Sequence, residues 1–252
     1  MIKKSQKNKL ALITGGTRGI GEACVLAFAN KGYDVAFTYK SSNKKAIDLE
    51  KKIKTLGVKV TSAKVDNSKK QEIEKMVNIV LKKFGQIDVL VNNAGISEIK
   101  KFEDIKEKDW NKTIDTNLKG SFFWSQIVFK HMKKRKTGRI INMASQAGTS
   151  GGFIIGMHYS ISKGGILCLT KSLAKLGASS NILVNSVSPG LVKTDMINTF
   201  KHEIKKELTK NIPIGRMADP KEIANVVTFL ASDKASYITG ANISVNGGML
   251  MI

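Results

Sequence analysis

The strongest constraint on the fold is the alternation of short apolar runs with longer segments of helical periodicity along the whole chain. The predicted strands span residues 10–14, 34–39, 58–65, 89–92, 139–143, 183–187 and 243–245, and the predicted helices span 20–30, 44–56, 69–84, 110–133, 157–176 and 220–231. Strands that alternate with helices pair in parallel, because each helix carries the chain back across the sheet. The chain is therefore predicted to be an α/β protein, with a doubly wound parallel sheet of about seven strands flanked by helices on both faces.

Length and composition indicate one domain over residues 1–252, because the sequence has no internal repeat and no linker rich in proline or glycine. Ser42 and Ser68 are expected to cap the second and third helices, and Gly177 to end the helix that begins near residue 157. Cys24 and Cys168 fall in helical segments and are expected to be buried, reduced thiols.

The cellular location is predicted from the apolar runs. None approaches the ~20 residues that a transmembrane helix requires. The first residues are basic, but the apolar run behind them is too short for the core of a signal peptide. A cytoplasmic protein with no membrane partner is therefore expected.

The chain is strongly basic, with 42 Lys and Arg against 20 Asp and Glu and a formal net charge of +22. Such a charge raises the question of nucleic-acid binding. The lysines are spread over many helices, however, and the aromatic residues, 6% of the chain, do not interleave with them. We interpret the charge as a solvated basic surface, with no nucleic-acid partner, that attracts nucleotides, phosphates or an acidic carrier protein.

A glycine-rich motif, TGGTRGIG at residues 14–21, follows the first strand directly. Gly15, Gly19 and Gly21 permit a tight turn, a close approach of the backbone to a pyrophosphate and close packing of helix against strand. The N-terminus of the following helix offers free N–H groups and a partial positive charge to the same anion. The motif indicates a dinucleotide-binding Rossmann fold.

The end of the second strand bears on the choice of cofactor. Proteins that prefer NAD place an acid there for the ribose 2′-hydroxyl, but residues 37–42 contain none. Lys40 and Arg18 are cations that can hold a 2′-phosphate, with Ser41 as a hydroxyl donor. We predict NADP(H); the alternative is that Lys40 is only one of many surface lysines.

Tyr159 and Lys163 lie four residues apart, on one face of a predicted helix. An ammonium group near a phenol lowers its pKa, so that the phenol can act as a general acid or base near neutral pH. This spacing alone is common by chance, and its meaning depends on the polar residues that follow other strands.

Those residues occur in a fixed order along the chain: Asn92-Asn93-Ala94-Gly95, then Asn117, then Ser145, then Tyr159-Ser160-Ile161-Ser162-Lys163, then Pro189-Gly190 with Thr194-Asp195. With TGGTRGIG, they make the chain resemble the short-chain dehydrogenase/reductase family over nearly its whole length. The C-terminal SYITG at 236–240 and VNGG at 245–248 resemble the branch that contains 3-oxoacyl-[acyl-carrier-protein] reductases.

The resemblance implies catalytic roles for four residues. Ser145 polarises the substrate carbonyl, Tyr159 protonates its oxygen, Lys163 lowers the pKa of Tyr159 and holds the nicotinamide ribose, and Asn117 anchors a water that relays protons to Lys163. It also implies cofactor contacts from Gly15, Thr17, Arg18, Gly19, Ile20, Gly21, Lys40, Ser41, Asp66, Asn67, Asn93, Ala94, Gly95, Tyr159, Lys163, Pro189, Gly190, Val192 and Thr194. Asp66 would contact the adenine, Asn93, Ala94 and Gly95 would flank its ribose, and Val192 and Thr194 would bind the carboxamide.

Substrate identity is less constrained. The segment 146–158 is expected to form one wall of the pocket; it is apolar at Phe153, Ile154, Ile155 and Met157, which suits an acyl chain unless these side chains only fill the core. The segment 193–214 is expected to be a mobile lid with apolar Met196, Ile197 and Phe200. The three histidines, including His158, show no metal-binding spacing, so no metal is predicted and His158 is expected to be non-catalytic.

A carrier protein is the partner that the resemblance implies. Its basic docking residues are expected beside the pocket, at Lys133, Lys134, Arg135 and Lys136 and near Ser179-Ser180, but the second position departs from the pattern. Leu176-Gly177 also replaces an acid that is frequent at that helix end. The resemblance further implies a homotetramer, with helices 110–133 and 157–176 at one interface, where Gly164 and Gly165 permit close approach, and residues 248–252 at a second.

The resulting hypothesis is an NADPH-dependent oxidoreductase that reduces a ketone, a 3-oxoacyl thioester before others. The alternatives are another alcohol/ketone pair (acetoacetyl-CoA, a sugar or polyol, or a steroid) and a non-enzymatic NADP-binding or nucleic-acid-binding protein. Fold alone does not choose among these substrates.

Overall fold

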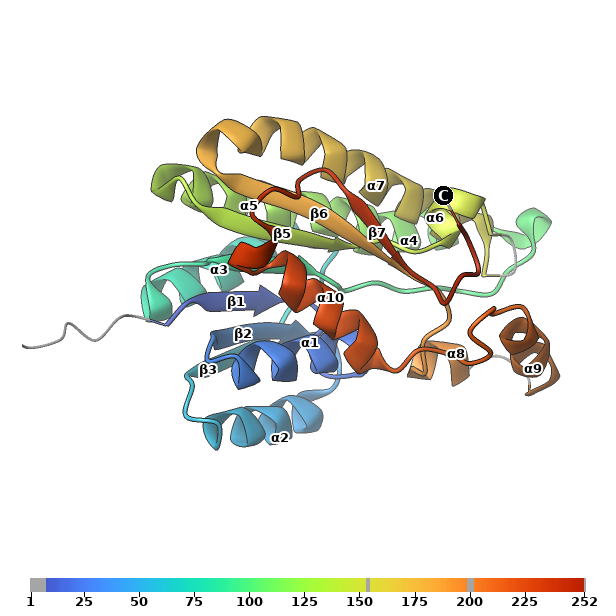
Figure 1. Cartoon of the computed structure of the whole chain (residues 1–252), viewed down its shortest axis with the longest axis horizontal. Coiled ribbons are helices and arrows are strands. Elements are labelled where there is room, and N and C mark those ends of the chain that lie inside the picture. Colours follow the sequence, from blue (N-terminus) through green and yellow to red (C-terminus); the bar gives the residue numbers. More distant parts are fainter. Residues whose placement is uncertain (1–7, 153–154, 199–201, 252) are drawn as a thin grey trace, which may run out of the picture.

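The computed structural model describes residues 8–152, 155–198 and 202–251. Its centre is one sheet of seven parallel strands in the order β3-β2-β1-β4-β5-β6-β7. The strands are β1 (Leu10–Ile13), β2 (Asp34–Tyr39), β3 (Val60–Lys64), β4 (Val89–Asn92), β5 (Gly138–Met143), β6 (Ile182–Pro189) and β7 (Asn242–Val245). Figure 1 shows the visible strands running in one direction. The predicted α/β, doubly wound Rossmann fold is confirmed.

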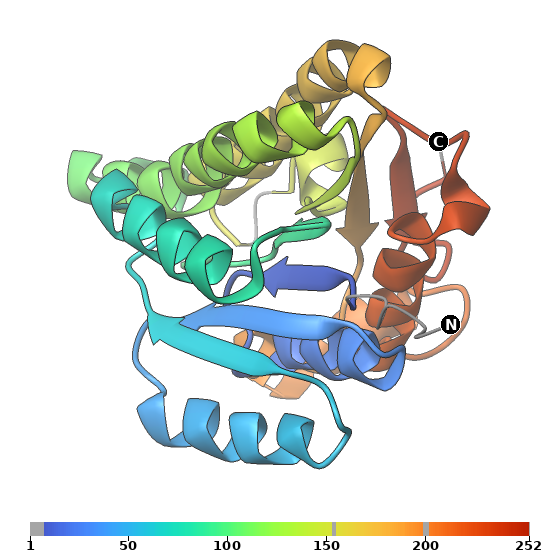
Figure 2. The same cartoon turned by 90° about the vertical axis from the view of Figure 1, so that its left-hand side faces the viewer.

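Helices cover both faces of the sheet (Figure 2). One apolar core lies between the sheet and α1 (Gly19–Asn30), α2 (Asn43–Lys54) and α10 (Pro220–Leu230). The other lies between the sheet and α3 (Lys70–Phe84), α5 (Gly120–Arg135) and α7 (Met157–Gly177). Burial from both sides explains why β1 reads as an unbroken apolar run, with all of its residues buried.

The order of the strands fixes the position of a ligand site. The chain builds outward from β1 through β2 to β3, and then returns to place β4 on the other side of β1. Doubly wound sheets bind ligands at this reversal, beyond the carboxyl ends of the strands. The glycine-rich turn after β1 and the Asn93-Ala94-Gly95 turn after β4 both lie there.

Two expectations about helix ends and thiols are wrong, and a third is confirmed only in position. Ser42 is the N-cap residue of α2 as predicted, but its side chain makes no capping bond. Lys69, not Ser68, precedes α3, because the Ser68 hydroxyl donates to the Asp66 carboxylate at 2.7 Å. Cys24 is buried as predicted, but Cys168 is exposed on α7.

Helix α7 ends at Gly177 as predicted, but without the left-handed backbone with which glycine usually ends a helix. Gly177 belongs to the last turn of α7 with right-handed backbone angles, and the chain continues as a 3-10 turn, Ala178–Ser180. The left-handed residue that ends this turn is Asn181, at φ 53°.

The predicted helix 110–133 is interrupted. It consists of α4 (Glu107–Ile114), a π-helical turn (Asp115–Lys119) and α5. Short π segments frequently occur at functional sites, and this one contains Asn117.

The predicted lid contains two short helices, α8 (Asp195–Asn198) and α9 (His202–Lys210), which lie beyond the carboxyl ends of the strands (Figure 1). The predicted pocket wall contains α6 (Ala147–Ser150). Phe153, Ile154 and Phe200, the side chain of Met196, and Ile252 lie outside what the structure describes. The mobility of the lid stays a prediction.

Candidate active site

The glycine-rich turn forms a cradle between the ends of β1 and β4. Gly15 and Gly19 have φ values of 68° and 54°, in the left-handed region that favours glycine. At Gly21 a Cβ atom would lie 2.0 Å from the Gly15 carbonyl oxygen, so helix α1 could not approach the turn with any side chain there. The first turn of α1 has no side-chain cap, which leaves its N–H groups available to an anion.

Hydrogen bonds with the residues that follow β4 hold this turn in place. The Asn93 amide donates to the carbonyl oxygens of Thr14 and Gly15 at 2.9 and 3.1 Å. The Thr14 hydroxyl oxygen accepts from the backbone N–H groups of Asn93 and Ala94, both at 2.9 Å. Asn93 therefore fixes the cradle itself, which adds to the ribose contact that the sequence predicts for it.

A cleft of about 470 Å³ opens beside the cradle, and most predicted site residues line it. These are Gly15, Thr17, Arg18, Gly19, Ile20, Gly21, Lys40, Ser41, Asn67, Asn93, Ala94, Gly95, Ser145, Tyr159, Lys163, Pro189, Gly190, Val192 and Thr194. Among the lining residues that sequence analysis missed are Thr38, Ile96, Ser97, Met143 and Asp195. Each lies within two residues of a predicted one, so proximity to a motif was the available signal.

Two predicted site residues, Asp66 and Asn117, do not line the cleft. Asp66 instead forms an ion pair with Lys40, with 3.0 Å between Nζ and Oδ2. Partial burial raises the pKa of Asp66, but hydrogen bonds from Ser68 and the Lys40 ammonium outweigh it and hold the pKa at about 2. Arg18 likewise lies 3.5 Å from the carboxylate of Asp195. Both cations proposed for a 2′-phosphate thus have a carboxylate partner in this structure.

Ser145 and Tyr159 form the polar centre of the cleft. Ser145 follows β5, where its hydroxyl oxygen accepts from the Ala147 N–H at 3.2 Å, and Tyr159 lies in the first turn of α7. Burial raises the pKa of Tyr159, and a hydrogen bond with Ser145 opposes that rise without cancelling it. Both residues line the same cleft, as two donors to one carbonyl oxygen require.

Lys163 lies beneath Tyr159 on the same helix. Its ammonium donates to the Met143 carbonyl oxygen at 2.6 Å and lies 5.7 Å from the centroid of the Tyr159 ring. Burial lowers the pKa of Lys163 to about 8. The lowering of the Tyr159 pKa by Lys163 stays a prediction, since burial of the phenol raises that pKa on balance in this structure.

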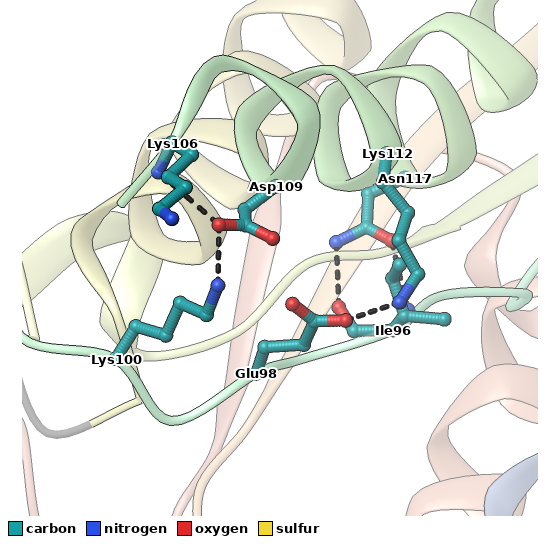
Figure 3. A network of polar contacts seen from close by, with 7 residues as sticks. All are labelled: Ile96, Glu98, Lys100, Lys106, Asp109, Lys112 and Asn117. Carbon is teal, nitrogen blue, oxygen red and sulfur yellow. Dashed lines mark hydrogen bonds and ion pairs between the residues drawn. The ribbon is translucent and has the colours of Figure 1, made fainter. Parts of the chain in front are cut away.

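Asn117 is buried in the π-helical turn and binds the chain that follows β4 (Figure 3). Its side chain accepts from the Ile96 N–H at 2.8 Å and donates to the Ile96 carbonyl oxygen at 2.9 Å and to the Ser162 hydroxyl at 3.1 Å. Gly95 lies between Asn117 and Lys163: a Cβ there would lie 3.3 Å from Asn117 Oδ1 and 3.6 Å from Lys163 Nζ. The water relay itself stays a prediction.

His158 is fully buried and does not line the cleft, so it points away from the site as expected. Within residues 8–152, 155–198 and 202–251, no three His, Cys, Asp or Glu side chains are arranged to hold a metal ion. Over the same ranges, no helix is both long and apolar enough to cross a membrane.

The expectation that the basic cluster at Lys133, Lys134, Arg135 and Lys136 lies beside the cleft is wrong for a single chain. The cluster ends α5 and precedes β5, which places it at the amino ends of the strands, whereas the cleft lies at their carboxyl ends. The Ala178–Ser180 turn precedes β6 at that same edge. Arg135 is also bound to Asp88, with 2.6 Å between Nη2 and Oδ1.

Comparison with known proteins agrees with this geometry. The family model described as "Enoyl-(Acyl carrier protein) reductase" matches residues 15–250. A 3-oxoacyl-[acyl-carrier-protein] reductase of Staphylococcus epidermidis is 43% identical over 245 residues, which cover 97% of this chain and 100% of the relative. Similar reductases of Staphylococcus aureus and Aquifex aeolicus are 42% and 40% identical over 96% of this chain and 98% of each relative.

A doubly wound sheet with a glycine cradle and a Ser-Tyr-Lys cleft defines a nicotinamide-dinucleotide oxidoreductase. The chain belongs to the short-chain dehydrogenase/reductase family, and within it the chain is similar to 3-oxoacyl-[acyl-carrier-protein] reductases.

Proposed function

We propose that this protein uses NADPH to reduce a 3-oxoacyl thioester, carried by an acyl carrier protein, to the 3-hydroxyacyl thioester. The observation that carries the proposal is that Ser145, Tyr159 and Lys163 line the same cleft as the glycine cradle. Relatives 40–43% identical over nearly the whole chain bear the name 3-oxoacyl-[acyl-carrier-protein] reductase, which supports the choice of substrate.

The side chains divide the work of ketone reduction among them. Ser145 donates a hydrogen bond to the carbonyl oxygen and stabilises the negative charge that develops on it. Tyr159 gives its proton to the same oxygen, and its raised pKa keeps it protonated and ready to act as an acid. Lys163 and Asn117 lie behind Tyr159, where they would restore that proton.

The cradle fits a dinucleotide because a side chain at Gly21 would close it and because the first N–H groups of α1 are uncapped. A bound NADPH supplies hydride to the carbonyl carbon. Lys40 and Arg18 would hold its 2′-phosphate, with Ser41 beside them, and would exchange Asp66 and Asp195 for the phosphate. Lys40→Ala should therefore weaken NADPH binding about tenfold and leave NADH binding nearly unchanged.

The second candidate is another alcohol/ketone pair: acetoacetyl-CoA, a sugar or polyol, or a steroid. It is favoured by the departure at Ser179-Ser180 and by the position of the basic cluster (Lys133, Lys134, Arg135 and Lys136) at the far edge of the sheet. Half-buried Ile155 and exposed Met157 belong to the segment 146–158 that is predicted to form a pocket wall, although neither lines the cleft of the single chain; such a wall would favour an acyl group over a sugar.

The proposal is tested by following NADPH oxidation with a 3-oxoacyl thioester, on carrier protein and on CoA, beside a 2-enoyl thioester, sugars and steroids. We expect turnover of the 3-oxoacyl thioester, lost in Tyr159→Phe while NADPH binding, measured by fluorescence titration, is kept. Turnover of a different ketone, with none of the 3-oxoacyl thioester, would assign the protein to a different substrate class and leave the proposed mechanism in place. Absence of turnover on every ketone would refute the proposed chemistry.

We also propose a cytoplasmic homotetramer. Exposed apolar side chains on the helices predicted for one interface support it: Trp110, Phe122, Ile161 and Leu176. Met251 is exposed within the predicted second interface, residues 248–252. In such an assembly the basic cluster of one copy would lie beside the cleft of another copy, where it could bind an acidic carrier protein. Light scattering on the purified protein should give four chains, and a monomer would refute the assembly.

A further inference from the structure

The connecting segment, residues 94–101, carries the chain from β4 toward α4 without helix or strand. Its residues Ile96 and Ser97 form part of the cleft wall. A segment without backbone pairing of its own needs side-chain contacts to keep one position. The contacts that this segment makes therefore decide how well one wall of the cleft is defined.

Two ion pairs attach the connecting segment to α4 (Figure 3). Glu98 pairs with Lys112, and Lys100 pairs with Asp109, which is itself 9% exposed and also accepts from the Lys106 N–H at 3.1 Å. Asp109 and Lys112 lie three residues apart on α4, so they present one face of the helix to the segment.

The Glu98–Lys112 pair lies closest in sequence to the catalytic residues. Glu98 is two residues from Ile96, whose backbone N–H and carbonyl both bind the Asn117 side chain. Lys112 is on α4, which leads directly into the π-helical turn that contains Asn117. The ion pair therefore joins the same two stretches of chain that Asn117 joins.

The connecting segment also contacts the first turn of α7. A Cβ atom on Gly156 would lie 2.8 Å from the Glu98 carbonyl oxygen and 2.6 Å from Cε1 of His158, the residue before Tyr159. Displacement of Glu98 would thus change two parts of the structure. It would shift Ile96 relative to Asn117, and it would shift the start of α7, the helix that carries Tyr159 and Lys163.

We propose that Glu98 and Lys112 are positioning residues for the reaction: their ion pair holds the connecting segment on α4, and thereby holds Asn117 against Ile96 behind Lys163. The inference rests on the proposed function of Asn117, Tyr159 and Lys163. Neither side chain lines the cleft, so the pair acts on the rate through the placement of other groups. This role requires one acidic and one basic side chain at positions 98 and 112, but either position can carry the acid.

The test uses Glu98→Lys, Lys112→Glu and the double variant that carries both changes and restores an ion pair in reversed order. Each single variant should lower kcat about tenfold with little change in KM, and the double variant should recover most of the loss. Hydrogen exchange provides a readout independent of activity, because the Ile96 N–H donates to Asn117: peptides covering 94–101 should exchange faster in each single variant and slow again in the double.

The matched control reverses another Lys–Glu pair, Lys70 and Glu74 on α3, which should leave kcat and exchange in 94–101 unchanged. If either single variant fails to fold, Glu98→Gln and Lys112→Gln take its place, with smaller losses expected.

Three results would overturn the inference. They are single variants with normal kcat, a double variant as impaired as the singles, and unchanged exchange at Ile96. If the wild-type protein turns over no ketone, the proposed function fails separately, and the exchange comparison still decides whether the ion pair holds the segment.

Discussion

Replacing Lys163 by methionine should make the protein more stable at neutral pH while it abolishes turnover. Lys163 is 5% exposed, and burial lowers its pKa from 10.5 to about 8. At 1.36 kcal/mol per pKa unit, this corresponds to a cost of about 3 kcal/mol for keeping the ammonium charged in the folded state. Loss of its hydrogen bond to the Met143 carbonyl oxygen offsets about 1 kcal/mol of the gain. Lys163→Met should therefore be about 2 kcal/mol more stable at pH 7.

The pH dependence gives this prediction its sign. Between pH 8 and 10.5 the unfolded wild-type chain binds more protons at residue 163 than the folded chain, so wild-type stability rises with pH over that window. Below pH 8 the wild-type protein bears the full cost of the buried Lys163 ammonium. Above pH 10.5 Lys163 is neutral in both the folded and the unfolded chain, so the cost is absent. The advantage of Lys163→Met should thus shrink from pH 8 upward, and by pH 10.5 the variant should be about 1 kcal/mol less stable than wild type.

Urea unfolding of the cofactor-free protein, followed by Trp fluorescence at fixed protein concentration, measures the difference. Lys171→Met, which removes an exposed lysine from the same helix, is the matched control. Its stability relative to wild type should not change sign between pH 7 and 10.5. A difference between Lys163→Met and wild type that is constant from pH 7 to 10.5, or a less stable variant at pH 7, would refute the reasoning.

Three further outcomes are expected. Gly21→Ala should weaken NADPH binding more than tenfold in a fluorescence titration, because its Cβ would lie 2.0 Å from the Gly15 carbonyl oxygen; unchanged affinity would contradict the cradle geometry. Trp124→Phe should cost about 1–3 kcal/mol in urea unfolding, since it removes the 2.6 Å bond from Nε1 to Asn67 Oδ1 and leaves that oxygen without its donor; a neutral effect would argue against that bond. In the native protein a thiol reagent should leave Cys24 unmodified, because Cys24 is buried and its pKa is raised to about 12; labelling of native Cys168→Ser would contradict this.

Local sequence patterns predicted most of the cleft. The glycines of the cradle, Ser145, Tyr159 and Lys163 each belong to a motif that directly follows or begins a regular element, and the parallel topology brings such ends to one edge. The same topology, applied to Lys133–Lys136, would have placed that cluster at the opposite edge, because a helix that leads into a strand ends at the strand's amino end. The resemblance alone implied a position beside the cleft, and the direction of the chain through α5 into β5 excludes that position within one chain.

Other features of the site depend on residues far apart in sequence. Asp66 follows β3 and Lys40 follows β2, and only the pairing of these strands brings the two charges within 3.0 Å. Asn117 reaches Ile96 because a π-helical turn aims it at the connecting segment, and no periodicity in the sequence marks that turn.

The sequence by itself determined the order of strands and helices, the glycine cradle and the identity of the polar groups, because these depend on neighbouring residues. Only the tertiary structure decided how those groups behave. Burial raises the pKa of Tyr159 and lowers the pKa of Lys163, and the partners of Asn117, Glu98 and Lys40 come from other elements. Burial and long-range pairing are properties of the folded chain, since both arise from residues that only the fold brings together.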